Sequence, residues 1–256
     1  MNERDFEMDK LKYLIPNGFT AFSMMLGLAS VVHSMQGNYE LAAWMILWGV
    51  LLDKLDGTAA RVLNASSPFG AQLDSFADFV SFGIAPAALL FFGLSDVDMV
   101  HYGWMMASAG IYIVAVAARL ARFNISEPPN GHLMFYGIPT TLMGALLSSG
   151  YLAWLKLGLI DEYMAPMPFV LFIASCAMVS NVRLPKLKVR KNMFLNIFQV
   201  LNILFAFVFA PLKMFPEILF CQGLFYVMVG IMWYGIRPPM EDEGAEKHSE
   251  TEEALI

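Results

Sequence analysis

Residues 41–63, LAAWMILWGVLLDKLDGTAARVL, are apolar for most of their length and carry charged side chains toward their end. After the short segment NASSP, residues 64–68, a second apolar stretch follows at residues 69–94, FGAQLDSFADFVSFGIAPAALLFFGL. A helix needs about 20 residues to cross a hydrocarbon core of roughly 30 Å, and both stretches reach that length. The turn chemistry of the intervening segment completes the pattern of a hairpin of two membrane-spanning helices.

The composition of the whole chain extends this interpretation. Of the 256 residues, 58% are hydrophobic and only 15% are charged, and the mean hydropathy is +0.58. Such values exclude a soluble globule. Six further apolar stretches lie at residues 14–32, 99–118, 139–157, 166–182, 193–212 and 218–236. We therefore expect an all-α polytopic membrane bundle of about eight transmembrane helices, although the short sixth stretch leaves a count of seven open.

The distribution of lysine and arginine favours eight helices. With eight crossings, every one of the 16 basic residues except Lys156 and Lys213 falls on one side of the membrane. Removing one helix would invert every later loop and destroy this division. By the positive-inside rule, both termini and the second, fourth and sixth connections should lie in the cytoplasm, most simply at a prokaryotic cytoplasmic membrane.

The chain divides into three parts. Residues 1–13 mix charged and apolar side chains, which predicts a short interfacial amphipathic helix ahead of the bundle. Residues 14–237 form one transmembrane domain, and residues 238–256 form an acidic cytoplasmic tail that we expect to be disordered. The tail accounts for the formal net charge of −6, so the charge balance gives no sign of nucleic-acid binding. Cys176 and Cys221 lack the spacing of a zinc site or a disulfide framework.

Four aspartates lie within the hairpin, where ionisable groups are suspected of function. Asp53 and Asp56 are three residues apart on one helix, and Asp74 and Asp78 are four apart on the next. Each pair therefore shares a helix face. In an antiparallel hairpin, facing residues have a constant sum of numbers, and the sums for Asp53 with Asp78 and for Asp56 with Asp74 differ by one. We expect the four carboxylates to converge.

Four close carboxylates need compensation, because mutual repulsion and loss of water both destabilise their ionised forms. Oxygen ligands without neighbouring histidine or cysteine favour Mg²⁺ or Mn²⁺. Small residues at Gly57, Ala60 and Gly70 leave room beside the acids, and Arg61 adds positive charge. The set suits a pyrophosphate substrate, whose oxygens bridge metals during phosphoryl displacement. The structural alternative is that the acids form ion pairs with Lys54 and Arg61.

Eight positions with fixed spacing resemble the signature of the CDP-alcohol phosphotransferase family, with no departure: Asp53, Asp56, Gly57, Ala60, Arg61, Gly70, Asp74 and Asp78. Residues 73–86, 119–124, 137–139 and 179–183 further resemble the phosphatidylserine synthase branch of that family, and residues 15–20 are similar to its entry to the first helix. The resemblance covers roughly residues 14–191.

The resemblance implies an integral membrane enzyme that uses a divalent cation and usually forms a homodimer. Its substrates would be CDP-diacylglycerol and an alcohol, here L-serine, and its products phosphatidylserine and CMP. Asp53, Asp56 and Asp74 would be metal ligands, and Asp78 would complete this metal-binding acidic cluster and also act as general base. The residues that would line the CDP-lipid site are Gly57, Ala60, Arg61 and Gly70.

The sequence leaves open which residues would contact the acceptor. Arg119 and Arg122 either anchor the fourth helix at the membrane surface or recognise a phosphate or the serine carboxylate. Ser81 is either a helix-packing hydroxyl or a polar contact in the alcohol pocket. Arg183 belongs to a basic cluster, residues 183–191, that would face anionic lipids, although Arg183 could also reach the substrate.

Two other functions remain as alternatives. Sister enzymes that use glycerol phosphate, inositol phosphate or choline share the whole acidic signature, so only the segments outside it favour serine. An ion-coupled transporter would also place acids within the membrane. Against a transporter, the acids gather at one end of a single hairpin, and the sequence shows no inverted repeat.

Overall fold

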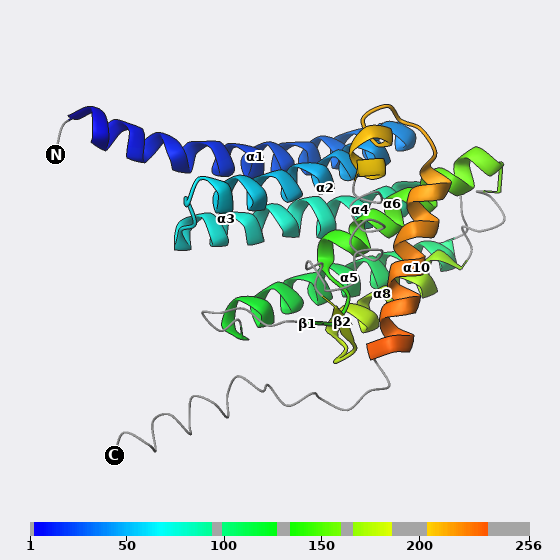
Figure 1. Ribbon diagram of the computed structural model, residues 1–256. Coiled ribbons are helices and arrows are strands. Elements are labelled where there is room, and N and C mark those ends of the chain that lie inside the picture. Colours follow the sequence, from blue (N-terminus) through cyan, green and yellow to red (C-terminus); the bar gives the residue numbers. More distant parts are fainter. Residues whose placement is uncertain (1–2, 94–98, 127–133, 160–165, 186–203, 235–256) are drawn as a thin grey trace, which may run out of the picture.

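The computed structural model describes residues 3–93, 99–126, 134–159, 166–185 and 204–234, and helices make up nearly all of these ranges (Figure 1). The helices with defined bounds are α1 (Glu3–Met35), α2 (Tyr39–Val62), α3 (Pro68–Asp78), the π-helix η1 (Phe79–Ile84), α4 (Ala85–Gly93), α5 (Met99–Ser126), α6 (Thr140–Leu157), α8 (Met167–Val179) and α10 (Pro216–Tyr234), and residues 204–209 are helical as well. Two short strands, β1 (Met134–Tyr136) and β2 (Arg183–Pro185), are a minor addition to the predicted all-α class, which is confirmed.

Within these described ranges, three helical stretches are long and apolar enough to cross a membrane, namely Lys12–Met35, Pro68–Gly93 and Tyr102–Ile125. Met167–Val179 and Pro216–Met232 are shorter apolar helices. The chain is an integral membrane protein, while the count of eight spans stays a prediction. Most of the predicted stretch 193–212 and the whole acidic tail lie outside the described residues. The predicted N-terminal segment continues into the first span, because α1 runs unbroken from Glu3 to Met35.

Helices α1 and α2 form an antiparallel pair that lies along one side of the bundle (Figure 1). The chain reverses at Gly37, whose φ of +77° is a left-handed conformation that glycine adopts without strain. Two serine hydroxyls of α1 then donate to backbone carbonyls of α2: Ser30 to Ala42 at 2.9 Å and Ser23 to Gly49 at 3.2 Å. Small side chains at a helix interface allow this close approach inside a membrane.

The span Pro68–Gly93 is continuous from α3 through η1 to α4, but its helical winding changes at its centre. Ser67 caps α3 by accepting a hydrogen bond from the Gly70 N–H at 3.0 Å, and Pro68 occupies the first turn. The π-helical turn follows Asp78 directly. Neighbouring helices bond to it, since the Tyr112 hydroxyl donates to the Phe82 carbonyl at 2.8 Å. The sequence predicted a helix here without indicating this widened turn.

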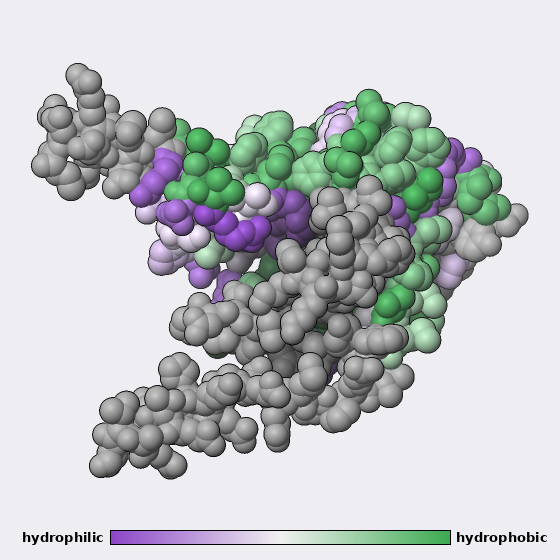
Figure 2. All heavy atoms as spheres, viewed as in Figure 1, coloured by the Kyte–Doolittle hydropathy of each residue, from purple (hydrophilic) through white to green (hydrophobic). Residues whose placement is uncertain are grey.

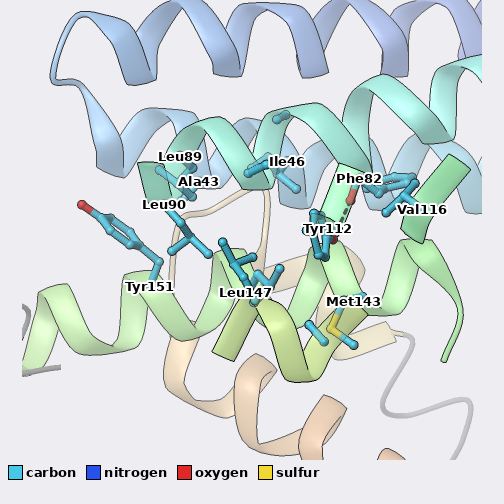
Figure 3. Close-up of a cluster of buried hydrophobic side chains, with 14 of the residues drawn as sticks. Ala43, Ile46, Phe82, Leu89, Leu90, Tyr112, Val116, Met143, Leu147 and Tyr151 are labelled. Carbon is cyan, nitrogen blue, oxygen red and sulfur yellow. Dashed lines mark hydrogen bonds between the residues drawn. The ribbon is translucent and has the colours of Figure 1, made fainter. Parts of the chain in front are cut away.

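The core lies where α2, α4, α5, α6 and η1 meet. Phe82 of η1 and Tyr112 of α5 contact each other there, with Ile46 and Leu90 nearby and Leu147 of α6 opposite (Figure 3). The outer faces remain strongly apolar, as expected of a surface covered by lipid tails. Figure 2 shows hydrophobic side chains spread over the helical surface and hydrophilic ones gathered where α2 ends and α3 begins.

A short antiparallel ladder joins β1 to β2, with Phe135 opposite Leu184. It connects the segment after α5 with the segment after α8, which are the fourth and sixth connections of the predicted topology. Gly137 follows β1 with φ of +73°, and a side chain there would collide with the Met178 carbonyl. The ladder therefore gathers two predicted same-side connections at one end of the bundle.

Candidate active site

Three carboxylates meet across the α2–α3 hairpin. Asp53 and Asp56 project from α2, and Asp74 projects from α3, with one oxygen of each lying within 4.8 Å of the others. The i, i+3 spacing puts the first two on one face of α2, and the capped start of α3 brings the third alongside them. The hairpin thus concentrates three acidic groups at the level that the residue numbers predicted.

Asp56 is the most enclosed of the three, with 6% of its surface exposed. The Thr20 hydroxyl of α1 lies 2.8 Å from Asp56 Oδ2, in position to donate to it. Thr20 was not among the predicted site residues. Its only signal in the sequence is its place in the segment 15–20, which is similar to the family's entry to the first helix but does not indicate a role for Thr20.

Ion pairing does not neutralise this cluster. Lys54 Nζ lies 3.3 Å from Asp53 Oδ2, but the lysine side chain is 56% exposed, so the pair is weak. Arg61 turns instead to Thr58, donating to its hydroxyl at 3.3 Å. Among the described side chains, Lys54 is the one cation paired with these acids. Ion pairs with Lys54 and Arg61, which were the structural alternative for these acids, therefore leave most of the negative charge uncompensated.

The donor set fits a hard divalent cation. Three carboxylates within reach of one centre supply the oxygen ligands that Mg²⁺ and Mn²⁺ prefer, and the described part of the chain adds no histidine or cysteine to the group. A bound cation would also compensate the repulsion between acids that are partly removed from water. Asp53, Asp56 and Asp74 could therefore hold a metal ion.

Asp78 has different partners. Its Oδ2 accepts a hydrogen bond from the Thr140 hydroxyl at 3.0 Å, and Arg119 Nη1 donates to the same hydroxyl at 3.2 Å. Arg119 comes from α5 and is only 6% exposed, so a buried cation lies close to this acid. The structure thus groups three of the four predicted acids and connects the fourth to α5 and α6.

The small residues of the signature fall into two environments. Among the described residues, a side chain at Gly57 would meet only Arg61, at 3.9 Å, so the backbone on that face of α2 leaves room for an approaching ligand. Ala60 is half-buried on the same last turns of the helix. A side chain at Gly70 would instead lie 3.1 Å from Asn17 Oδ1 and 3.2 Å from the Ser67 hydroxyl. Gly70 therefore lets α3 approach α1.

Two of the predicted acceptor residues make structural contacts. Arg122 Nη1 donates to the Val179 carbonyl at 2.9 Å, where α8 ends. Ser81 is fully buried and donates to the Ser23 carbonyl at 2.9 Å, which agrees with the packing alternative. The Arg183 backbone pairs with Tyr136 in the β ladder, and its side chain lies outside the described part of the structure. Of the described acceptor candidates, Arg119 is the one linked to an acid of the site.

Comparison with known proteins gives the family. Residues 13–234 match the family model described as CDP-alcohol phosphatidyltransferase. The chain belongs to this family. It is 31% identical over 230 residues to a Helicobacter pylori CDP-diacylglycerol–serine O-phosphatidyltransferase, covering 86% of this chain and 95% of that relative. A relative of the same name from Methanocaldococcus jannaschii is 33% identical over 190 residues, 74% of this chain and 82% of its own.

A third relative has a different name, but that name also contains serine. It is an archaetidylserine synthase from Methanothermobacter thermautotrophicus, 30% identical over 176 residues, with 67% of this chain and 70% of the relative covered. The family that the acidic signature predicted is thus confirmed.

Proposed function

We propose that this protein is a membrane enzyme that transfers the phosphatidyl group of CDP-diacylglycerol to L-serine, producing phosphatidylserine and CMP. The observation that carries the proposal is the three-carboxylate cluster beside Asp78, in a chain whose relatives have serine in their names. Sister enzymes with other acceptors would share the cluster, so the cluster does not identify the acceptor. The choice of serine is supported by the names of the relatives.

The diphosphate would bind at the open end of the α2–α3 hairpin. Asp53, Asp56 and Asp74 would hold Mg²⁺ or Mn²⁺, which when bound neutralises the charge that develops on the phosphate oxygens. Gly57 and Ala60 leave space for the nucleotide side of the substrate, and the exposed Arg61 offers a guanidinium fork suited to phosphate oxygens.

The transfer step needs a base close to the acceptor. The serine hydroxyl oxygen would form a bond to the phosphorus that carries diacylglycerol, and the bond from that phosphorus to the oxygen bridging the two phosphates would break, releasing CMP. The hydroxyl proton would move to the Asp78 carboxylate. Asp78 suits this role because it lies one helical turn from Asp74 while remaining outside the three-carboxylate group.

The acceptor's carboxylate would meet positive charge from Arg119. This guanidinium is buried beside the Asp78–Thr140 contact, and its Nε has no hydrogen-bond partner among the described residues. Arg122 is less suited, because it donates to the end of α8. We further propose that the enzyme works as a homodimer, with its active site on the cytoplasmic side of a prokaryotic membrane, where the basic loops are expected.

The decisive experiment is CMP release by the purified full-length protein in detergent. We expect release from CDP-diacylglycerol to require both serine and a divalent cation, and to stop when the cation is chelated. The same assay with glycerol phosphate, inositol phosphate and choline would identify a sister enzyme if one of them replaced serine. Absence of CMP release with every acceptor would instead favour the ion-coupled transporter.

A further inference from the structure

The first residue of α6, Thr140, connects the acid that we assign as base to a buried arginine. Its side chain is 1% exposed, and its hydroxyl lies 3.0 Å from Asp78 Oδ2 and 3.2 Å from Arg119 Nη1. These partners are 62 and 21 residues away in the sequence. One hydroxyl therefore joins three helices, α3, α5 and α6.

The chemistry of the three groups fixes the direction of both hydrogen bonds. A guanidinium has donors and no acceptor, and an ionised carboxylate has acceptors and no donor. The Thr140 hydroxyl must therefore accept from Arg119 and give its single proton to Asp78. The order cannot be reversed while both charges are present, so the hydroxyl presents its proton to the ionised carboxylate that awaits the acceptor's proton.

The surroundings make this contact important for the orientation of Asp78. The acid is the last residue of α3, directly before the π-helical turn, where the regular winding of the helix changes. A threonine is also stiff about its first side-chain bond, because two heavy atoms branch from Cβ. Thr140 is thus a rigid donor aimed at one oxygen of a carboxylate, leaving the other oxygen for the acceptor's proton.

We propose that Thr140 is a positioning residue of the transfer reaction: aligned by Arg119, its hydroxyl holds the Asp78 carboxylate in the orientation that removes the proton from the acceptor. This inference rests on the proposed function. Thr140 itself does not contact the substrate and acts only through Asp78. Its hydroxyl, rather than its methyl group, carries the effect.

The test distinguishes the effect of the Thr140 hydroxyl from the effect of its side-chain volume. Thr140→Val removes the hydroxyl and keeps the shape, whereas Thr140→Ser keeps the hydroxyl and removes the methyl group. Thr141→Val is the matched control, because its side chain points about 100° away around the same helix turn. Each full-length variant is purified in detergent and assayed for kcat, for KM with each substrate, for its divalent-cation requirement and for its thermal unfolding temperature.

We expect Thr140→Val to lower kcat by about 10²-fold, the scale of a misplaced catalytic group, while KM for CDP-diacylglycerol and the cation requirement stay unchanged. Thr140→Ser should recover most of that loss, and Thr141→Val should behave as wild type. Unchanged kcat in Thr140→Val would overturn the inference. Equal losses in the valine and serine variants would also overturn it, because they would assign the effect to packing.

Two further outcomes are also decisive. If Thr140→Val fails to fold, Thr140→Ala is compared with Thr140→Ser, and equal activity of these two overturns the inference. If the wild-type protein uses another acceptor than serine, the proposed function is wrong, and the same variants are compared with that acceptor. The wild-type measurement thus tests the function, and the difference between variants tests the position of Asp78.

Discussion

The Thr20 hydroxyl of α1 lies 2.8 Å from Oδ2 of Asp56 on α2, so the first helix takes part in the acidic cluster. The same hydroxyl lies 3.0 Å from the Pro16 carbonyl one turn earlier, and its one proton can serve only one of these acceptors at a time. A cation bound by Asp56 would withdraw electron density from the carboxylate, while the donor fixes its orientation, as outer-shell partners do at metal sites. The α1–α2 pair is therefore part of the site as well as of the bundle.

Thr20→Val should weaken metal binding, so that the reaction needs a higher concentration of divalent cation. The substitution keeps the shape of the side chain but removes the donor to Asp56, and loss of such an outer-shell partner typically changes metal affinity or activity by about 10- to 100-fold. Titration of activity with Mg²⁺ or Mn²⁺ measures the shift. Thr20→Ser should restore wild-type behaviour, and a valine variant with an unchanged titration curve would show that Thr20 only packs.

Replacing any one of Asp53, Asp56 and Asp74 with asparagine should reduce both the rate and the response to divalent cations. Asparagine keeps nearly the same volume but removes one anionic ligand from the cluster. CMP release measured against cation concentration tests this. Glu217→Gln is the control, since this acid pairs with Lys156 at 2.7 Å and belongs to neither the cluster nor the signature. Full activity with the same cation requirement in the aspartate variants would refute the metal assignment.

Asp78→Asn should abolish transfer while leaving CDP-diacylglycerol and metal binding largely intact. The asparagine cannot take the serine proton, and a positioned base typically contributes about 10² to 10⁴ in rate. Calorimetric binding of the nucleotide lipid is compared with turnover for the same variant. If binding and turnover fall together, Asp78 is mainly a metal ligand, and if turnover survives, another group takes the proton.

Gly27→Ala should destabilise the bundle without directly altering the acids. A Cβ at this position would lie 2.7 Å from the Ser81 Cα, so α1 and η1 would have to separate. Overpacking of this kind typically lowers the free energy of unfolding by about 1–3 kcal/mol. Thermal unfolding in detergent measures the change. Gly103→Ala on α5 is the control, because no atom of the described residues lies within 4 Å of its added methyl group. Equal unfolding temperatures of the two variants would contradict the close packing at Gly27.

The sequence alone determined the class of the protein and the core of its site. Hydropathy predicts membrane helices because each must be apolar over the whole bilayer thickness. The acids at 53, 56 and 74 meet because helical periodicity and a short capped turn are local properties that residue spacing records. Family membership could likewise be inferred from this one hairpin, because its eight signature positions lie within 26 consecutive residues, 53–78.

Only the tertiary structure decided which groups surround those acids. Periodicity shows which face of a helix a residue occupies, but not which other helix packs there. Thr20 reaches Asp56 across 36 residues and Thr140 reaches Asp78 across 62, and no local pattern indicates either contact. The same limit applies to Arg122, whose partner is the end of α8. These contacts depend on how distant helices cross, and that crossing is set by the packing of the whole bundle.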